Sequence, residues 1–128
     1  MKKFIRIILL LISVTTLLSG AMQVIVPAYV LNFVGAEIDE TTKQLFATIG
    51  MFMFLFGGMM IHVLYNEEDN RVAVIWSGLQ KLGASVAVFI GIYKGVFIAL
   101  AAGVASFDLL SGILFFYYLR ILKSNEIR

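Results

Sequence analysis

The sequence contains no cysteine, a single proline and a single histidine among its 128 residues. The missing cysteines exclude a disulfide, a thiolate metal site and a cysteine nucleophile. Charged residues make up only 14% of the chain, against roughly 25% in ordinary soluble domains. The short motifs of serine hydrolases, zinc proteases, P-loop enzymes and dinucleotide-binding domains are also missing. We therefore expect no metal and no cofactor, and the sequence does not favour an enzyme.

Hydrophobic residues, by contrast, form 61% of the chain, and the mean hydropathy is +0.98. The charges gather mainly in four short clusters, near residues 2–6, 37–43, 67–71 and 120–128. The apolar runs between them are about 20 residues long, enough for a helix to cross a hydrocarbon layer roughly 30 Å thick. The pattern predicts an all-α fold: an integral membrane antiparallel four-helix bundle, built as a single domain over residues 1–128.

Four transmembrane helices are predicted, at about residues 4–34, 45–65, 72–93 and 96–119. Residues with turn and capping preferences mark their boundaries. Gly35 is expected to end the first helix, and Asp39 or Thr41 to cap the second. Lys94 and Gly95 predict a minimal turn between the last two helices.

The first predicted helix contains Pro27, which offers no N–H to the carbonyl of Gln23 and therefore predicts a kink. A cleaved signal peptide is the alternative, because small residues at 19–21 resemble a cleavage site after Ala21. The apolar run, however, continues to Val34, beyond the roughly 7–15 apolar residues of a secretory signal. An uncleaved first helix is therefore favoured.

Positive residues are distributed unevenly between the two predicted sides of the membrane. If both termini are cytoplasmic, the outer side holds only Lys43 and Lys94. The cytoplasmic side then holds Lys2, Lys3, Arg6, Arg71, Arg120, Lys123 and Arg128. This bias predicts a protein of the bacterial cytoplasmic (inner) membrane with both termini in the cytoplasm. Because these residues flank the helices and form no basic stripe, we expect no nucleic-acid partner.

Two charged residues, Lys81 and Asp108, interrupt the predicted helices. At 1.5 Å per residue they lie about 15 and 18 Å from the cytoplasmic face. They are equally far along the chain from the predicted turn at residues 94–95, so a helical hairpin brings them to one level. A lone charge at this depth costs at least about 2.5–3.5 kcal/mol on insertion scales. We predict that they pair, either as a structural lock between helices or as a proton- or substrate-linked site.

Several polar side chains extend this candidate site. Ser77 and Gln80 precede Lys81 in the same predicted helix, and Ser111 follows Asp108 by one turn. Gln23 would reach the site from the first helix, or else form an ordinary hydrogen bond between helices. The single histidine, His62, lies near the end of the second predicted helix; it is either an interfacial residue or a proton relay.

Small residues recur every four positions along the third predicted helix: Gly83, Ala87, Gly91 and Gly95. Such a stripe allows two helix backbones to approach closely. The helix packed on it is either the fourth helix or that of a second copy in a homodimer. Membrane lipid is the other expected partner.

The size and the four-helix layout resemble small bacterial membrane proteins of the DoxX-like type, and the segments at residues 76–81 and 108–112 look like family signatures. The resemblance implies a four-helix membrane fold over the whole chain. It provides no motif of known role, so no functional residue is carried over.

Three functions remain open from the sequence. A lipophilic-ligand-binding or accessory (interaction) membrane protein is favoured. An oligomeric transporter or proton-coupled conduit that uses Lys81 and Asp108 is the first alternative. A membrane-embedded enzyme acting on a lipophilic substrate is the second.

Overall fold

A computed structural model describes residues 2–66 and 69–127, with side chains through residue 123. The described residues form no strand, and their fold is all-helical, as predicted. The elements are α1 (Lys2–Ile25), α2 (Pro27–Val34), α3 (Glu40–Tyr65), α4 (Arg71–Tyr93), a 3-10 helix η1 (Ala99–Ala101) and α5 (Ala102–Ile127). Four segments are long and apolar enough to cross a membrane: Lys2–Ile25, Glu40–Tyr65, Arg71–Tyr93 and Ala99–Lys123.

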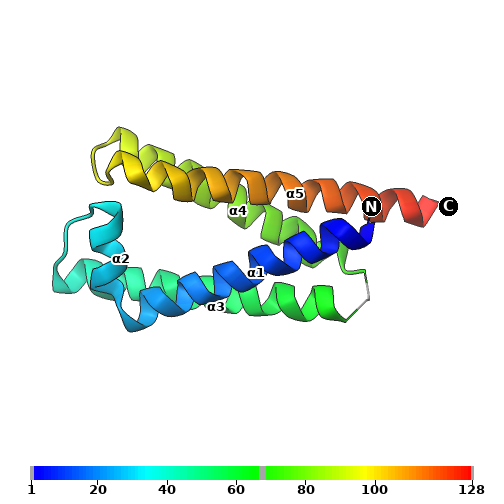
Figure 1. Ribbon diagram of the computed structural model, residues 1–128, viewed down its shortest axis with the longest axis horizontal. Helices are drawn as coiled ribbons and strands as arrows, with labels where there is room; N and C mark the ends of the chain where they lie inside the picture. Colours follow the sequence, from blue (N-terminus) through cyan, green and yellow to red (C-terminus); the bar gives the residue numbers. More distant parts are fainter. Residues whose placement is uncertain (1, 67–68, 128) are drawn as a thin grey trace.

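The long helices lie lengthwise, and the chain reverses direction from each one to the next (Figure 1). α1 packs along α3, and α4 packs along α5, so the molecule consists of two helical hairpins. The hairpins contact each other through α1 with α5 and through α3 with α4. α1 and α4 therefore lie diagonally across the molecule. α1 begins and α5 ends at the same end of the molecule (Figure 1).

The predicted first helix, residues 4–34, is broken rather than kinked. α1 ends at Ile25, α2 begins at Pro27, and Val26 between them has φ −131° and ψ 62°, outside the helical region. The proline ring disfavours helical geometry at the preceding residue, which explains the break at Val26. α2 then turns away from the axis of α1 towards the α4–α5 connection (Figure 1). The Ile98 amide donates to the Val34 carbonyl at 2.9 Å and ties the two segments together.

The predicted capping residues Gly35 and Asp39 take these roles. Gly35 adopts φ 73°, a left-handed conformation that favours glycine, and ends α2. Asp39 accepts from the Thr42 amide at 2.8 Å, and the Thr42 hydroxyl accepts from the Asp39 amide at 2.9 Å. This capping box starts α3 at Glu40, five residues before the predicted start at residue 45.

The connection between α4 and α5 is longer than the predicted minimal turn. α4 ends at Tyr93, and residues 94–98 together with η1 precede α5. Gly95 has φ 77°, and the Val96 amide donates to the Gly91 carbonyl at 2.8 Å. The side chain of Phe97 then folds over Gly91, where an added Cβ would lie 2.5 Å from its ring.

The closest helix contact involves glycines of α1 and α3, not the stripe predicted in the third helix. A Cβ on Gly20 would lie 2.5 Å from the Gly50 carbonyl oxygen, and one on Gly57 would lie 2.7 Å from the Leu17 amide nitrogen. Glycine therefore allows these two backbones to touch. In the predicted stripe, Gly83 has no atom within 4 Å of an added Cβ, and Ala87 is exposed.

The apolar core lies towards the end of the molecule where α1 begins. All four long helices contribute to it: Ile5, Leu9 and Ile12 from α1, Met60 and Leu64 from α3, Ala73 and Val74 from α4, and Phe115, Tyr118, Leu119 and Leu122 from α5. The outward faces are also apolar, with Leu11 64% and Leu110 62% exposed. Beyond the apolar core, the buried residues include several polar ones, among them Thr16, Lys81 and Ser85.

Candidate functional site

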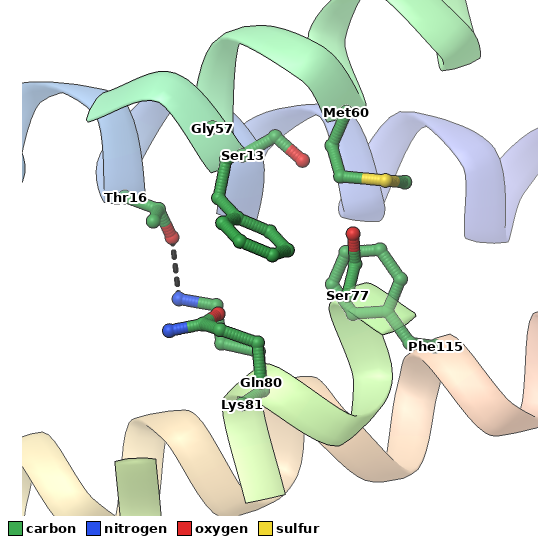
Figure 2. Close-up of a pocket in the computed structure, with 9 residues that line it drawn as sticks. Ser13, Thr16, Gly57, Met60, Ser77, Gln80, Lys81 and Phe115 are labelled. Atoms are coloured by element: carbon green, nitrogen blue, oxygen red, sulfur yellow. Dashed lines mark hydrogen bonds between the residues drawn. The ribbon is translucent and has the colours of Figure 1, made fainter. Parts of the chain in front are cut away.

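Lys81 crosses the interior of the molecule from α4. The residue is only 4% exposed, and its ammonium group donates to the Thr16 hydroxyl on α1 (Figure 2). It also donates to Asp108 Oδ1 on α5 at 3.3 Å. Because α1 and α4 belong to different hairpins, the bond to Thr16 joins the two hairpins across the diagonal of the bundle.

The surroundings of the Lys81–Asp108 pair strengthen the interaction between the two groups. The side chains of Lys81 and Asp108 are 6% and 14% exposed, so water screens their interaction little. The Lys81 nitrogen also lies 5.5 Å from the centre of the Phe107 ring, within the range of a cation–π contact. One carboxylate, one hydroxyl and one aromatic face thus contact the ammonium group.

Lys81 and Asp108 lie at the same height along the helix axes, as their equal spacing from the predicted turn indicates. Helices on either side of a reversal rise by the same amount per residue, so equal separations reach equal heights. The pair forms although the connection is longer than predicted. After the extra turn residues, η1 and the first residues of α5 run back along α4 and bring Asp108 to the level of Lys81.

A small cavity lies beside Lys81 between the hairpins (Figure 2). All four long helices line it: Ser13 and Thr16 from α1, Phe56, Gly57 and Met60 from α3, Ser77, Gln80 and Lys81 from α4, and Phe115 from α5. The volume open to the centre of a water molecule is about 10 Å³. The hydroxyl of Ser77 is buried and has no hydrogen-bond partner within the protein.

The other predicted site residues have different surroundings. Ser77 and Gln80 line the cavity. Ser111 is buried and donates to the Phe107 carbonyl within its own helix at 2.7 Å. Ser111 therefore has no contact with the Lys81 ammonium group among the interactions of the described residues.

Two predicted members, Gln23 and His62, lie away from the Lys81 cluster. The Gln23 amide nitrogen contacts Met53 Sδ at 3.2 Å, and Gln23 does not line the cavity. Gln23 is seven residues beyond Thr16, which places it about 10 Å farther along the helix. The side chain of His62 is exposed on α3 and does not line the cavity either, so it is not positioned to relay a proton to Lys81.

Sequence reasoning missed Ser13 and Thr16. Thr16 is the direct partner of Lys81, and both hydroxyls donate to carbonyls one turn earlier in α1. They belong to a stripe of small and polar residues on α1 that continues through Gly20 to Gln23. The spacing of 3, 4 and 3 residues is that of one helix face, and it marks this face of α1 as the one turned inwards.

A second group of charges lies at the end of the molecule where α1 begins. Lys2 pairs with Asp69 at 3.0 Å, with both side chains partly exposed. The guanidinium group of Arg6 donates to the Leu64 carbonyl in the last turn of α3. Carbonyls at this end of a helix have no intrahelical donor, so Arg6 compensates one of them. These contacts hold the start of α1 against the end of α3.

By its chemistry, the Lys81 cluster is a buried cation held by a carboxylate, a hydroxyl and a ring. Such a group can fix the positions of helices or exchange a proton with a neighbour. The adjoining cavity brings more hydroxyls close to it, but its volume is about that of one water molecule. No protein-family model, curated protein or solved structure matches the chain.

Proposed function

We propose that this chain is an integral protein of the bacterial cytoplasmic membrane, with four spans and both termini in the cytoplasm. Four helices of sufficient length and their exposed apolar faces support the membrane location. Lys2 and Arg6 contact residues at the α3–α4 end, whereas Lys43 and Lys94 belong to the opposite end. This separation of positive charge supports the orientation.

Within that membrane, we propose that the protein acts as an accessory or interaction protein, by contacting lipid and other membrane helices. The observation that carries this proposal is that the packed interior leaves little space for a ligand. Its one buried lysine contacts Thr16, Asp108 and Phe107, and the adjoining cavity has only about 10 Å³. Pockets for small ligands are usually about 300–1,000 Å³. A lipophilic ligand would therefore bind to the outer surface.

A second copy of the chain remains a proposed partner through the small-residue stripe of α4. Gly83 and Ala87 are exposed there, and an added Cβ at Gly83 meets nothing. Gly91 does not belong to that open face, because Phe97 covers it. A homodimer contact would therefore centre on Gly83 and Ala87.

An oligomeric proton-coupled conduit is the second candidate, and one observation favours it. Hydroxyl groups of Ser13, Thr16 and Ser77 gather around the cavity beside Lys81. Ionisable residues inside the spans of membrane proteins mark proton pathways, and Lys81 and Asp108 are such residues.

Reconstitution of the purified chain into liposomes tests the two candidates against each other. An accessory protein should give no proton flux above that of empty liposomes. Flux that the Lys81→Met/Asp108→Leu variant abolishes would overturn the accessory proposal. In native membranes, a photoreactive residue at Ala87 should form a discrete protein adduct, whereas one at the exposed Leu110 on α5 should label mainly lipid. Labelling of lipid alone from both positions would also count against it.

A further inference from the structure

The hydroxyl group of Ser77 has no partner within the protein although it is deeply buried. Ser77 lies on α4 one turn before Lys81, is 3% exposed, and lines the cavity between the hairpins. Most serines buried in a helix donate to the carbonyl one turn earlier, as Ser13 and Ser111 do here. A buried hydroxyl that makes no such bond indicates that something else satisfies it.

The cavity has the volume of a site for one water molecule, and polar side chains are among those that line it. A single water needs roughly 10–15 Å³ for its centre and two to four polar partners. The cavity offers about 10 Å³ and is lined by five polar side chains, including Ser13, Ser77 and Lys81. The apolar lining residues bound it from α3 and α5 (Figure 2).

The hydrogen-bonding capacity left on the lining residues matches that of water. Ser13 donates to the Leu9 carbonyl and keeps an acceptor position. Ser77 can donate and accept. Together these groups provide both donors and acceptors for one small polar molecule.

We propose that this cavity binds one structural water molecule, which links Ser77 of α4 to Ser13 of α1, whose hydroxyl groups lie on the same side of the cavity (Figure 2). The positive charge of Lys81 disfavours a metal cation at this point, and the volume disfavours an organic ligand. The water would form a second link between the hairpins, one turn from the Lys81–Thr16 bond. Since α1 and α4 lie diagonally, it fills space that neither backbone reaches.

A thermal-shift experiment with Ser77→Ala tests the proposal through the sign of its effect. If water bonds Ser77, the substitution removes a partner of that water, and the Tm of the purified protein in detergent should fall by several degrees. If the cavity is dry, the substitution removes an unsatisfied polar group, and the Tm should rise or stay unchanged. Ser111→Ala is the matched control, because that buried hydroxyl bonds only within its own helix; its Tm change should be the smaller one.

A crystal structure of the full chain, at a resolution that shows ordered water, provides a direct measurement that does not depend on a variant folding. Density for one water within hydrogen-bond distance of the Ser13 and Ser77 hydroxyl groups is expected. A cavity without density, or one filled by a different rotamer of Met60, would overturn the proposal.

Discussion

Removing one member of the Lys81–Asp108 pair should destabilise the protein strongly. At the observed 3.3 Å, two unit charges attract by about 5 kcal/mol at an effective dielectric constant near 20. Loss of one partner from a buried pair typically costs about 3–5 kcal/mol, because the other charge stays buried without compensation. After Asp108→Leu, Thr16 and Phe107 still contact the ammonium group. We therefore expect a cost near the lower limit, about 3 kcal/mol.

Removing both charges should restore much of that loss. In the double variant Lys81→Met/Asp108→Leu no buried charge remains, and apolar replacement of a buried ion pair is often neutral. The coupling energy should therefore reach about 2 kcal/mol, above the average of roughly 0.6 kcal/mol found for hydrogen bonds between membrane helices. Equilibrium unfolding in mixed micelles, followed by fluorescence of the single tryptophan, Trp76, measures all four corners of the cycle.

The control for this cycle is a pair of ions at the surface. Lys2 and Asp69 are 37% and 44% exposed, and such pairs contribute little. Their coupling in the same assay should be well below that of Lys81 and Asp108. If the costs of Lys81→Met and Asp108→Leu simply add in the double variant, the two residues do not interact energetically and the reasoning is refuted.

Three further predictions concern single positions. Thr16→Val should cost about 1.5–3 kcal/mol of unfolding free energy by removing an acceptor from the buried ammonium group. Thr15→Val, at an exposed hydroxyl in the same helix, should cost little. Chemical unfolding compares the two variants, and equal effects would contradict the assignment of Thr16 as a partner of Lys81. Gly20→Ala should lower the Tm sharply because its Cβ would meet the backbone of α3 at 2.5 Å. Gly83→Ala should keep or raise the Tm, because an added Cβ there meets open space. A larger loss of Tm for Gly83→Ala than for Gly20→Ala would show that α1 and α3 do not touch at glycine. Reporter fusions after Lys43 and at the carboxyl terminus should lie on opposite sides of the membrane, and same-side reporters would contradict the four-span topology.

The capping residues Gly35 and Asp39 were readable from the sequence because a cap depends on neighbouring residues, whereas the last helix, predicted at residues 96–119, is α5 (Ala102–Ile127). Gly35 and Asp39 act through their own backbone conformation and through hydrogen bonds within three residues. Pro27 also predicted where the first helix is interrupted, but not whether it kinks or breaks there. The proline ring disfavours helical geometry at Val26, and whether the chain kinks or breaks there also depends on what the next segment packs against. Here α2 packs beside η1, and the chain breaks at Val26.

The level of Lys81 and Asp108 was also determined by the sequence, since the helical rise is constant and both residues are equally far from the turn. Only the tertiary structure decided which other groups meet them. Thr16 is 65 residues from Lys81 along the chain, and no local periodicity relates two residues so far apart. The same holds for Gln23, which bonds Met53, 30 residues away, instead of joining the cluster. Hydropathy selects the helices and their lengths, but the helix faces that meet are selected by packing of complementary shapes, which exist only once all four helices are assembled.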